Sequence, residues 1–594
     1  MKVAEYVASF LQNKGIKDIF MLSGGFCLPL VDAIADSKIN YVCNLHEQAA
    51  AICAEAHAQY TNLPGVCVVT AGPGGTNALT GVTSAWLDSI PMIILSGQVQ
   101  SRDIKGVRKV RQIGFQEVDI VNLVKSITKC AVTVKDAKDI KCVMESAWHE
   151  ATTGRPGPVW VDIPLDIQSS QVEVEHLRPF VAETKKDKSV DLQKEVTRFY
   201  KLLNLAKRPV ILVGNGVRLA NAKEKFIKLA RNLDIPVLTT WKSMDFLDEQ
   251  DPLYVGRPGL IGQRGANFSQ QNSDLFISIG ARLDYGQTAF NHKNFARKAK
   301  KIIVDIDQSE IDKMDFEIEA EINFDAGEFI DEALKQRHLK QKSFSDWSNT
   351  CKNWHKKYPV ILQEYWNQKE HVNNYVLVDA LSQVMKPTDL LVPGSSGACS
   401  EVTMQAFNVK KGMRIFNSEG LGSMGFGVPA AIGGCVASNR ARTVCIDGDG
   451  GFIMNVQELE TVRRLNLPIK YFVLNNGGYV SIRNSQDKHF EKHVASSEES
   501  GVTLPDIKKI AFSYDLRYHR LDDHKNIVEN VKNILEAPGP SICEVIMHHT
   551  HESLPRNSTH KKEDGTFVSL PMEDLLPLLP REEFEENMSV SKDD

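Results

Sequence analysis

The sequence of 594 residues lacks the features of secreted and membrane-spanning chains. No stretch approaches the roughly 18 consecutive apolar residues that cross a bilayer, and the first residues lack the unbroken apolar core of a signal peptide. The eleven cysteines form no C-x-x-C pair and show no metal-like spacing with histidine. We therefore expect a cytoplasmic protein with reduced thiols and no membrane partner.

An excess of positive charge is also absent. Lys and Arg together number 70 and Asp and Glu number 75, which gives a net charge of −5. Such a chain has no overall field that attracts nucleic acid. The content of 42% hydrophobic and 24% charged residues also excludes wholesale disorder and a coiled-coil rod. The expected partners are small molecules and other protein chains.

The chain is too long for one hydrophobic core, and its apolar residues gather in short runs bounded by Gly or Pro. Runs of this kind, separated by helical patterns, are typical of parallel strands buried on both faces. Eight runs share the pattern: GVCVVTAGPGG, PMIILSG, PVWVDIP, PVILVGNG, LFISIGAR, KIIVDID, TVCIDGDGG and IKYFVLNNGG. The alternation predicts an α/β fold of three domains, each a doubly wound parallel sheet.

Two polar stretches, about 173–191 and about 335–346, are predicted to be linkers. They define an N-terminal domain (1–172), a central domain (190–335), a C-terminal domain (370–550) and a tail (551–594). The tail is rich in charge and proline from residue 561 onward, so we expect it to be irregular and its last ten residues to be disordered.

Two glycine-rich turns follow two of the predicted strands in the C-terminal domain, and their polar residues suit a divalent cation. Either turn alone is an ordinary tight turn in many α/β proteins. Together they end neighbouring parallel strands, where open α/β sheets bind ligands. Asp449, the amide oxygen of Asn476 and the carbonyl of Gly478 would form a hard oxygen set for Mg²⁺. Glycines let the backbone approach a diphosphate, here at Gly448, Gly450 and Gly451.

A GDG turn followed by NN after about this length resembles the signature of the thiamine diphosphate (ThDP) enzymes. Further segments resemble those of acetolactate synthase catalytic subunits, in the same order over nearly the whole chain: 46–50, 70–81, 115–120, 154–164, 277–284 and 417–434. The resemblance implies an N-terminal pyrimidine-binding domain, a central Rossmann-like domain and a C-terminal diphosphate-binding domain.

The resemblance also assigns catalytic roles in the N-terminal domain. The glutamate that matches Glu47 hydrogen-bonds N1′ of the ThDP aminopyrimidine and promotes the imino tautomer that removes the thiazolium C2 proton. Phe115 and Gln116 match positions near the reacting centre, where Gln116 would orient a substrate carbonyl. Without the resemblance, Glu47 would be interpreted as a carboxylate that stabilises the dipole at a helix N-terminus. Gln116 would be interpreted as a structural residue of a loop.

In the C-terminal domain, Met424 matches the bulky apolar residue that keeps the cofactor bent. A core methionine is an equally consistent interpretation, and both can hold at once. Gly394, Ser395 and Ser396 follow a predicted strand and would donate hydrogen bonds to the diphosphate. The alternative is that these three residues make only a polar loop.

The central domain begins with a strand and glycine turn that make a weak dinucleotide fingerprint, because Leu219 replaces the third glycine. The resemblance implies FAD as a possible cofactor, held by Arg282 and Asp305. An empty nucleotide fold stays open as the alternative. Two other classes also stay open: a nicotinamide-dependent oxidoreductase, and a non-catalytic interaction protein that kept the fold.

The sequence departs from the acetolactate synthase pattern at two cations. The segment 280–286 ends in Gly286 where these synthases carry a second arginine, and Leu165 stands where they carry lysine. Without two cations that would face an anionic acceptor, a second 2-keto acid is a less certain acceptor. The stretch 478–486 looks like acetolactate-synthase-like proteins of surface-sugar biosynthesis, where Arg483, Gln486 and the segment 551–565 would contact an aldehyde or keto-sugar nucleotide. A solvated rim is the interpretation that we favour for these residues.

The predicted reaction is decarboxylation of a 2-keto acid, with pyruvate as the expected donor, and transfer of the two-carbon acyl-anion unit to an acceptor carbonyl. Simple decarboxylation is the alternative. In the family, the pyrimidine half of each site comes from one subunit and the diphosphate half from another. The resemblance therefore implies a homodimer or a homotetramer.

Overall fold

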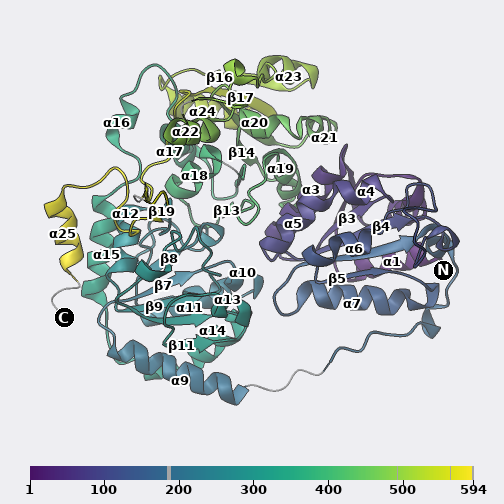
Figure 1. Ribbon diagram of the computed structural model, residues 1–594, viewed down its shortest axis with the longest axis horizontal. Coiled ribbons are helices and arrows are strands. Elements are labelled where there is room, and N and C mark those ends of the chain that lie inside the picture. Colours follow the sequence, from purple (N-terminus) through teal and green to yellow (C-terminus); the bar gives the residue numbers. More distant parts are fainter. Residues whose placement is uncertain (184–188, 396, 491, 562–563, 591–594) are drawn as a thin grey trace.

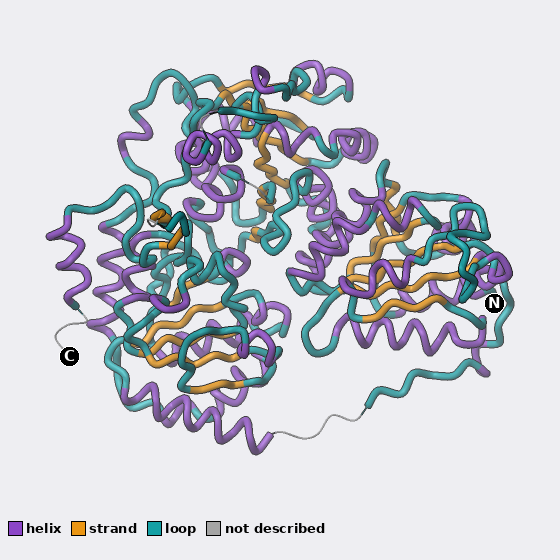
Figure 2. Tube along the Cα trace, in the orientation of Figure 1, coloured by secondary structure: helices purple, strands orange, loops and turns teal. Residues whose placement is uncertain are grey.

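The computed structural model describes residues 1–183, 189–395, 397–490, 492–561 and 564–590. These residues form three parallel sheets, each with helices on both faces (Figures 1 and 2). The predicted fold class is therefore confirmed, and all eight predicted runs lie on strands. The strands of these runs are almost wholly buried, as expected when helices cover both faces of a sheet.

The N-terminal sheet has the order β2-β1-β3-β4-β6-β5. Its strands are β1 (Asp18–Met21), β2 (Asn40–Cys43), β3 (Gly65–Val69), β4 (Met92–Gln98), β5 (Cys130–Thr133) and β6 (Pro158–Pro164). Its helices are α1 (Val3–Asn13), α2 (Leu28–Ala35), α3 (Glu47–Thr61), α4 (Pro73–Asn77), α5 (Leu79–Leu87), α6 (Ile120–Val124), α7 (Ile140–Thr152) and α8 (Leu165–Ser169).

The central sheet has the order β11-β10-β9-β7-β8. Its strands are β7 (Pro209–Val213), β8 (Val237–Thr239), β9 (Leu275–Ile279), β10 (Lys300–Val304) and β11 (Ala320–Ile322). Its helices are α9 (Ser189–Leu205), α10 (Gly216–Leu219), α11 (Lys223–Leu233), α12 (Arg264–Gln271), α13 (Gln308–Asp312), α14 (Ala326–Lys335) and α15 (Ser345–Lys357). Helix α15 packs on α12, and its Trp347 indole donates to the Pro209 carbonyl, so the central core continues past residue 335.

The C-terminal sheet has the order β13-β12-β14-β15-β17-β16. Its strands are β12 (Leu390–Pro393), β13 (Arg414–Ile415), β14 (Thr443–Gly448), β15 (Ile469–Asn475), β16 (Arg517–Leu521) and β17 (Ser541–Ile546). Its helices are α16 (Gln363–Trp366), α17 (Asn374–Val384), α18 (Ala398–Ala406), α19 (Gly427–Ala437), α20 (Asp449–Ile453), α21 (Leu459–Leu465), α22 (Val480–His489), α23 (Ile507–Ser513) and α24 (Ile527–Glu536).

The tail is more ordered than the sequence predicts. It forms the hairpin of β18 (Thr559–Lys561) and β19 (Phe567–Ser569), and then α25 (Arg581–Ser589), which lies beside α15 (Figure 1). Helix α12 explains this order, because its buried polar side chains bond to the tail: Asn267 donates to the Met572 carbonyl at 2.6 Å and Arg264 to the Leu575 carbonyl at 3.1 Å. The expectation of an irregular tail is wrong for these segments; residues 591–594 lie outside the described part.

The N-terminal and C-terminal domains meet where α3 crosses α19 (Figure 1). Helix α3 is rich in Ala and α19 in Ala and Gly, which allows their backbones to approach closely. A Cβ atom on Gly433 of α19 would overlap the carbonyl oxygen of Cys53 in α3. One merged hydrophobic core therefore spans the two domains.

The crossing predicts that Gly433→Ala will destabilise the protein, because the new methyl group would press against a backbone carbonyl that cannot move aside. Overpacking of this kind costs about 1–3 kcal/mol in the free energy of unfolding. Denaturant titration measures the loss, with Gly25→Ala as the control, because a Cβ on Gly25 meets no atom of the described part of the chain within 4 Å. Equal stabilities for the two variants would contradict the proposed close crossing.

Candidate active site and nucleotide cavity

Asp449 joins the two glycine-rich turns at the ends of the paired strands β14 and β15. One carboxylate oxygen accepts a hydrogen bond from the amide of Gly450 at 2.8 Å. The other accepts from the amides of Asn476 at 3.2 Å and Gly478 at 3.0 Å. The structure therefore brings together the three residues predicted to bind a metal.

The side-chain oxygen of Asn476 fits a cation, because it is buried without a hydrogen-bond partner among the described residues. A buried polar atom of this kind is unfavourable unless a ligand satisfies it. Burial also raises the pKa of Asp449, although the surrounding amides oppose the shift. A divalent cation at this point would satisfy the Asn476 oxygen and favour the ionised carboxylate.

Arg483 of α22 holds the second turn in place. The sequence predicts a solvated rim or a contact with the acceptor for this residue, but Arg483 is only 5% exposed. The guanidinium donates to the carbonyls of Asn476 at 2.8 Å, Gly477 at 3.1 Å and Ser496 at 2.8 Å. The favoured interpretation of a solvated rim is therefore wrong for Arg483, which holds the second turn through these hydrogen bonds, whereas its contact with an acceptor stays a prediction.

Two of the predicted diphosphate glycines have a structural role that the sequence did not reveal. A Cβ on Gly394, Gly427 or Gly451 would overlap the carboxyl group of Asp447. This buried carboxyl accepts from the amide of Gly448 at 2.9 Å, and burial raises its pKa to about 7. Gly394 and Gly451 therefore make room for Asp447 beneath the site.

Met424 lies over the first turn. Its terminal methyl group is 3.4 Å from the position that a Cβ on Gly450 would occupy, and the ring of Tyr479 covers the same glycine. No atom of the described residues lies within 4 Å of a Cβ built on Gly448, so these residues leave the backbone there open to a ligand. This arrangement fits a cofactor that rests on the turn with Met424 against it.

Ser395 is fixed by the loop that leads to Met424. Its hydroxyl accepts from the amide of Ser418 at 3.0 Å, and the Ser418 hydroxyl lies 2.6 Å from that of Ser84 in the N-terminal domain. Ser84 also donates to the buried Glu55 at 3.0 Å, where burial raises the pKa to about 8. The prediction for Ser396 concerns a residue outside the described part.

Glu47 is the first residue of α3 and is 7% exposed. The His46 ring accepts from the amide of Gln48 at 3.1 Å and so caps the helix. Asn77 donates to one Glu47 carboxylate oxygen at 3.0 Å. The other oxygen lies 3.6 Å from the position that a Cβ on Gly74 would occupy. The loop 72–75, which we call the Gly72 loop, therefore leaves space beside this oxygen.

Within one chain, the start of α3 touches the C-terminal domain through Gln48. The Asn455 amide donates to the Gln48 side-chain oxygen at 3.2 Å and to the Gly425 carbonyl at 2.7 Å. The residue beside Glu47 is thus linked to the turn that carries Met424.

Phe115 and Gln116 lie on a loop that contacts the Gly72 loop, the glycine-rich segment beside Glu47. A Cβ on Gly72 would lie 2.5 Å from the Gln116 carbonyl oxygen, which places the two loops in contact. The buried Glu117 accepts from the amides of Ile113 at 2.8 Å and Gly114 at 3.3 Å, and so shapes the loop. Phe115 is 78% exposed in the single chain.

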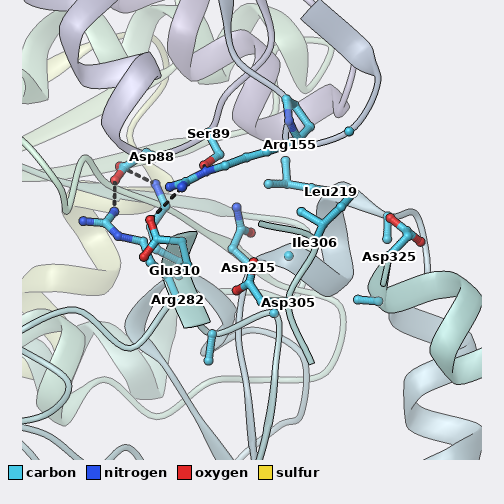
Figure 3. A pocket seen from close by; sticks show the side chains of 18 of the residues that line it. Asp88, Ser89, Arg155, Asn215, Leu219, Arg282, Asp305, Ile306, Glu310 and Asp325 are labelled. Carbon is cyan, nitrogen blue, oxygen red and sulfur yellow. Dashed lines mark hydrogen bonds and ion pairs between the residues drawn. The ribbon is translucent and has the colours of Figure 1, made fainter. Parts of the chain in front are cut away.

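Arg282 and Asp305, the two predicted FAD contacts, line one cavity of about 360 Å³ between the domains (Figure 3). The cavity is bounded by all three domains and by the start of α10 at the glycine turn after β7. Burial raises the pKa of Asp305 to about 6. The two residues are therefore brought together, as expected for a nucleotide site.

Further residues of this cavity were missed by the sequence reasoning. Arg155 bonds to Asp307 at 2.9 Å and to Glu310 at 2.6 Å. Asn215 carries a buried side-chain oxygen without a partner among the described residues. Arg155 lies in the segment 154–164, which resembles the acetolactate synthases, and Asn215 lies in the glycine turn after β7. Both residues could therefore have been predicted from these two motifs.

Asp88 forms a junction at the edge of the cavity (Figure 3). Its carboxylate accepts from Lys242 at 2.9 Å and from the amides of Glu419 at 2.9 Å and Gly420 at 2.8 Å. Arg282 lies 3.9 Å away. No motif in the sequence pointed to Asp88, because its partners come from two other domains.

Comparison with protein families matches three models to the three domains. The N-terminal TPP binding domain of thiamine pyrophosphate enzymes matches residues 1–123, the central domain 196–333 and the C-terminal TPP binding domain 395–545. These matches, together with the site, define the chain as a thiamine diphosphate-dependent enzyme.

Comparison with curated proteins narrows the class. A probable acetolactate synthase large subunit of Methanocaldococcus jannaschii is 33% identical over 93% of each chain. Acetolactate synthase 1, chloroplastic, of Zea mays is 32% identical over 93% of this chain and 86% of its own. The Escherichia coli acetolactate synthase isozyme 1 large subunit is 30% identical over 91% of this chain and 93% of its own. The chain belongs to the acetolactate synthase large-subunit family, which confirms the predicted resemblance.

In the part of the chain that the structure describes, no helix has both the length and the apolar character needed to cross a membrane.

The network around Glu55 predicts a specific pH dependence of stability. The folded protein holds the Glu55 proton up to about pH 8, whereas the unfolded chain releases it near the ordinary value of 4.5. The folded state thus binds more protons between these values, so the free energy of unfolding falls as the pH rises. Glu55→Gln should remove this part of the slope between about pH 5 and about pH 8.

Urea titrations at several pH values measure this slope. Glu536→Gln on the exposed end of α24 is the control and should keep the slope of the unaltered protein. A Glu55→Gln slope parallel to that of the control would show that Glu55 does not titrate as described.

Proposed function

We propose that this enzyme decarboxylates a 2-keto acid, with pyruvate as the donor, and transfers the two-carbon acyl-anion unit to an acceptor carbonyl. The observation that carries the proposal is the bridge from Asp449 to the second turn, beside the unsatisfied oxygen of Asn476. Such a bridge at the carboxyl edge of a parallel sheet suits a metal bound to a diphosphate.

Mg²⁺ would be held by Asp449, the Asn476 side-chain oxygen and the Gly478 carbonyl. The turn at Gly448 would admit the diphosphate oxygens, because no atom of the described residues lies within 4 Å of a Cβ built there. The diphosphate contact at Gly450 stays a prediction, since the ring of Tyr479 and Met424 lie against that glycine. Diphosphate contacts at Gly394, Ser395, Ser396 and Gly451 remain predictions. When bound, thiamine diphosphate supplies the nucleophilic carbon and the electron sink for decarboxylation.

Glu47 would hold and move the proton at the aminopyrimidine nitrogen. Asn77 anchors one carboxylate oxygen and leaves the other beside the open glycine loop. Met424 would keep the cofactor bent, because its side chain lies over the metal turn. Gln116 would orient the substrate carbonyl, and Phe115 would exclude water from that side of the site.

FAD is proposed for the cavity between the domains, with Arg282 and Asp305 as contacts. The unsatisfied oxygen of Asn215 and the guanidinium of Arg155 support a polar ligand there. Flavin absorbance in the purified protein would test this cofactor directly. A colourless protein that also fails to bind added FAD would contradict it.

We further propose a homodimer or homotetramer in the cytoplasm. Phe115 and Val107 are exposed apolar residues on the loop beside the site, and a second copy of the chain would cover them. No disulfide joins any of the eleven cysteines, all of which lie in the described part of the chain, and this fits a reducing compartment.

Glu47→Gln is expected to lower pyruvate consumption by about 10²–10⁴-fold, because the amide cannot exchange the proton. Binding of thiamine diphosphate, measured by calorimetry, should persist in this variant. Glu536→Gln serves as the control and should consume pyruvate normally. Undiminished turnover in Glu47→Gln would remove Glu47 from the mechanism.

Asn476→Ala is expected to raise the Mg²⁺ concentration for half-maximal thiamine diphosphate binding by about tenfold or more, because one oxygen ligand is lost. Quenching of tryptophan fluorescence at increasing Mg²⁺ measures this value. Asn533→Ala on exposed α24 is the matched control. If Asn476→Ala and the control need the same Mg²⁺ concentration, Asn476 is not a ligand.

A further inference from the structure

Asp162 of β6 is a buried carboxylate near the carboxyl edge of the N-terminal sheet, and the two neighbouring strands supply its hydrogen-bond donors. It pairs in register with Ser96 of β4 and Thr133 of β5. The carboxylate accepts from the hydroxyls of Ser96 at 2.6 Å and Thr133 at 3.1 Å, and from the side-chain amide of Gln98 at 3.2 Å. Because Asp162 is 1% exposed, its charge depends on these three donors.

Gln98 connects this carboxylate with the loop 104–118, which we call the Gln116 loop. It is the last residue of β4, and its side-chain amide also donates to the Val118 carbonyl at 3.0 Å. The side-chain oxygen accepts from the next backbone amide at 3.0 Å. An ionised carboxylate only accepts hydrogen bonds, so Asp162 keeps the NH₂ group of Gln98 turned toward Val118.

The Gln116 loop has a backbone conformation that needs support. Gln116 has a φ of 63°, in the left-handed region that residues with a Cβ rarely adopt. Such a conformation persists only where surrounding contacts enforce it. Glu117 supplies some of these contacts, because its carboxylate accepts from the amides of Lys105 and Ile113. The loop is thus closed on itself, and Gln98 ties the closed loop to the sheet.

A cavity of about 120 Å³ separates the loop from the sheet beside this hydrogen bond. Gln98, Thr133 and Asp162 line it from the sheet, and Glu117 and Val118 line it from the loop. A cavity removes the packing contacts that would otherwise hold two segments together. The position of the loop at this point therefore depends on the hydrogen bond from Gln98 to Val118.

The charge of Asp162 changes near neutral pH. Burial raises the pKa of Asp162 to about 6; its three donors oppose the rise, and the charge of Asp119 adds to it. Lys105, Glu117 and Asp119 also line the cavity. Above about pH 6 the carboxylate can accept all three hydrogen bonds, whereas below this pH it carries a proton and accepts less well. Gln98 is therefore held most firmly above about pH 6.

We propose that Asp162 and Gln98 are positioning residues, which hold the Gln116 loop so that the side chain of Gln116 reaches the substrate carbonyl. The inference rests on the proposed function. The Gln116 carbonyl lies against the Gly72 loop, so the Gln116 loop reaches the glutamate side of the site. Without the hydrogen bond from Gln98, the carbonyl of Val118 would move, and with it Gln116, two residues earlier in the chain.

Hydrogen exchange in the cofactor-free protein tests this anchor separately from the reaction. In Asp162→Asn and Gln98→Met the amides of the segment 113–117 should exchange about threefold to tenfold faster, because the loop loses one hydrogen bond. Asp32→Asn on the exposed face of α2 is the control and should exchange like the unaltered protein. Unchanged exchange in both Asp162→Asn and Gln98→Met would overturn the proposal.

The pH dependence of exchange in the unaltered protein gives a test that needs no folded variant. After correction for the intrinsic effect of pH on exchange, the segment 113–117 should exchange faster as the pH falls through about 6. Asp162→Asn should show no such step, because it carries no titrating group at this position. Corrected exchange in the unaltered protein that stays constant between about pH 5 and about pH 8 would also overturn the proposal.

Kinetic measurements separate this inference from the proposed function. With thiamine diphosphate and Mg²⁺, both variants should bind the cofactor normally, but kcat/KM for pyruvate should fall about threefold to tenfold. Adding Gln98→Met to Gln116→Ala should cost nothing further, because Gln98 acts through Gln116. Full additivity of these two changes would overturn the proposal. An unaltered protein that consumes no pyruvate would contradict the proposed function alone, since the exchange measurements do not depend on turnover.

Discussion

The ion pair between Asp88 and Lys242 is the contact on which the arrangement of the three domains depends. Asp88 ends α5, where the helix dipole is negative and a carboxylate is unfavourable without a cation. Lys242 of the central domain supplies that cation, and its other hydrogen bonds reach Gln59 at 2.6 Å and the Asn417 carbonyl at 2.7 Å. A buried pair of this kind is costly to break, because one charge would be left unpaired.

Asp88 contacts both the segment 417–420, which leads to Met424, and Arg282 of the cavity between the domains. The amides of Glu419 and Gly420 bond to Asp88, and the chain continues from them to Met424. Arg282 approaches Asp88 from the cavity. A ligand in the cavity and a cofactor at the metal turn would therefore both depend on where Asp88 holds the segment 417–420.

The sequence alone predicted the strands and the turns correctly, because these elements depend on residues that are close together along the chain. Buried runs such as GVCVV predicted strands correctly, and the turns at Asp449 and Asn476 meet because parallel strands end at one edge. Long-range partners were not predictable from one sequence. The polar sequence of α12 is typical of a solvent-exposed helix, but the helix is buried because the tail supplies its hydrogen-bond partners. Likewise, the residues next to Asp88 in the sequence do not indicate that Lys242 pairs with it.

Hydrogen exchange of the segment 417–424 tests the central claim most directly, because the amides of Glu419 and Gly420 are bonded to Asp88. In Asp88→Ala these amides should exchange markedly faster than in the unaltered protein, while those of α9, remote from the junction, should not change. Unchanged protection of Glu419 and Gly420 in Asp88→Ala would show that the junction does not hold the loop.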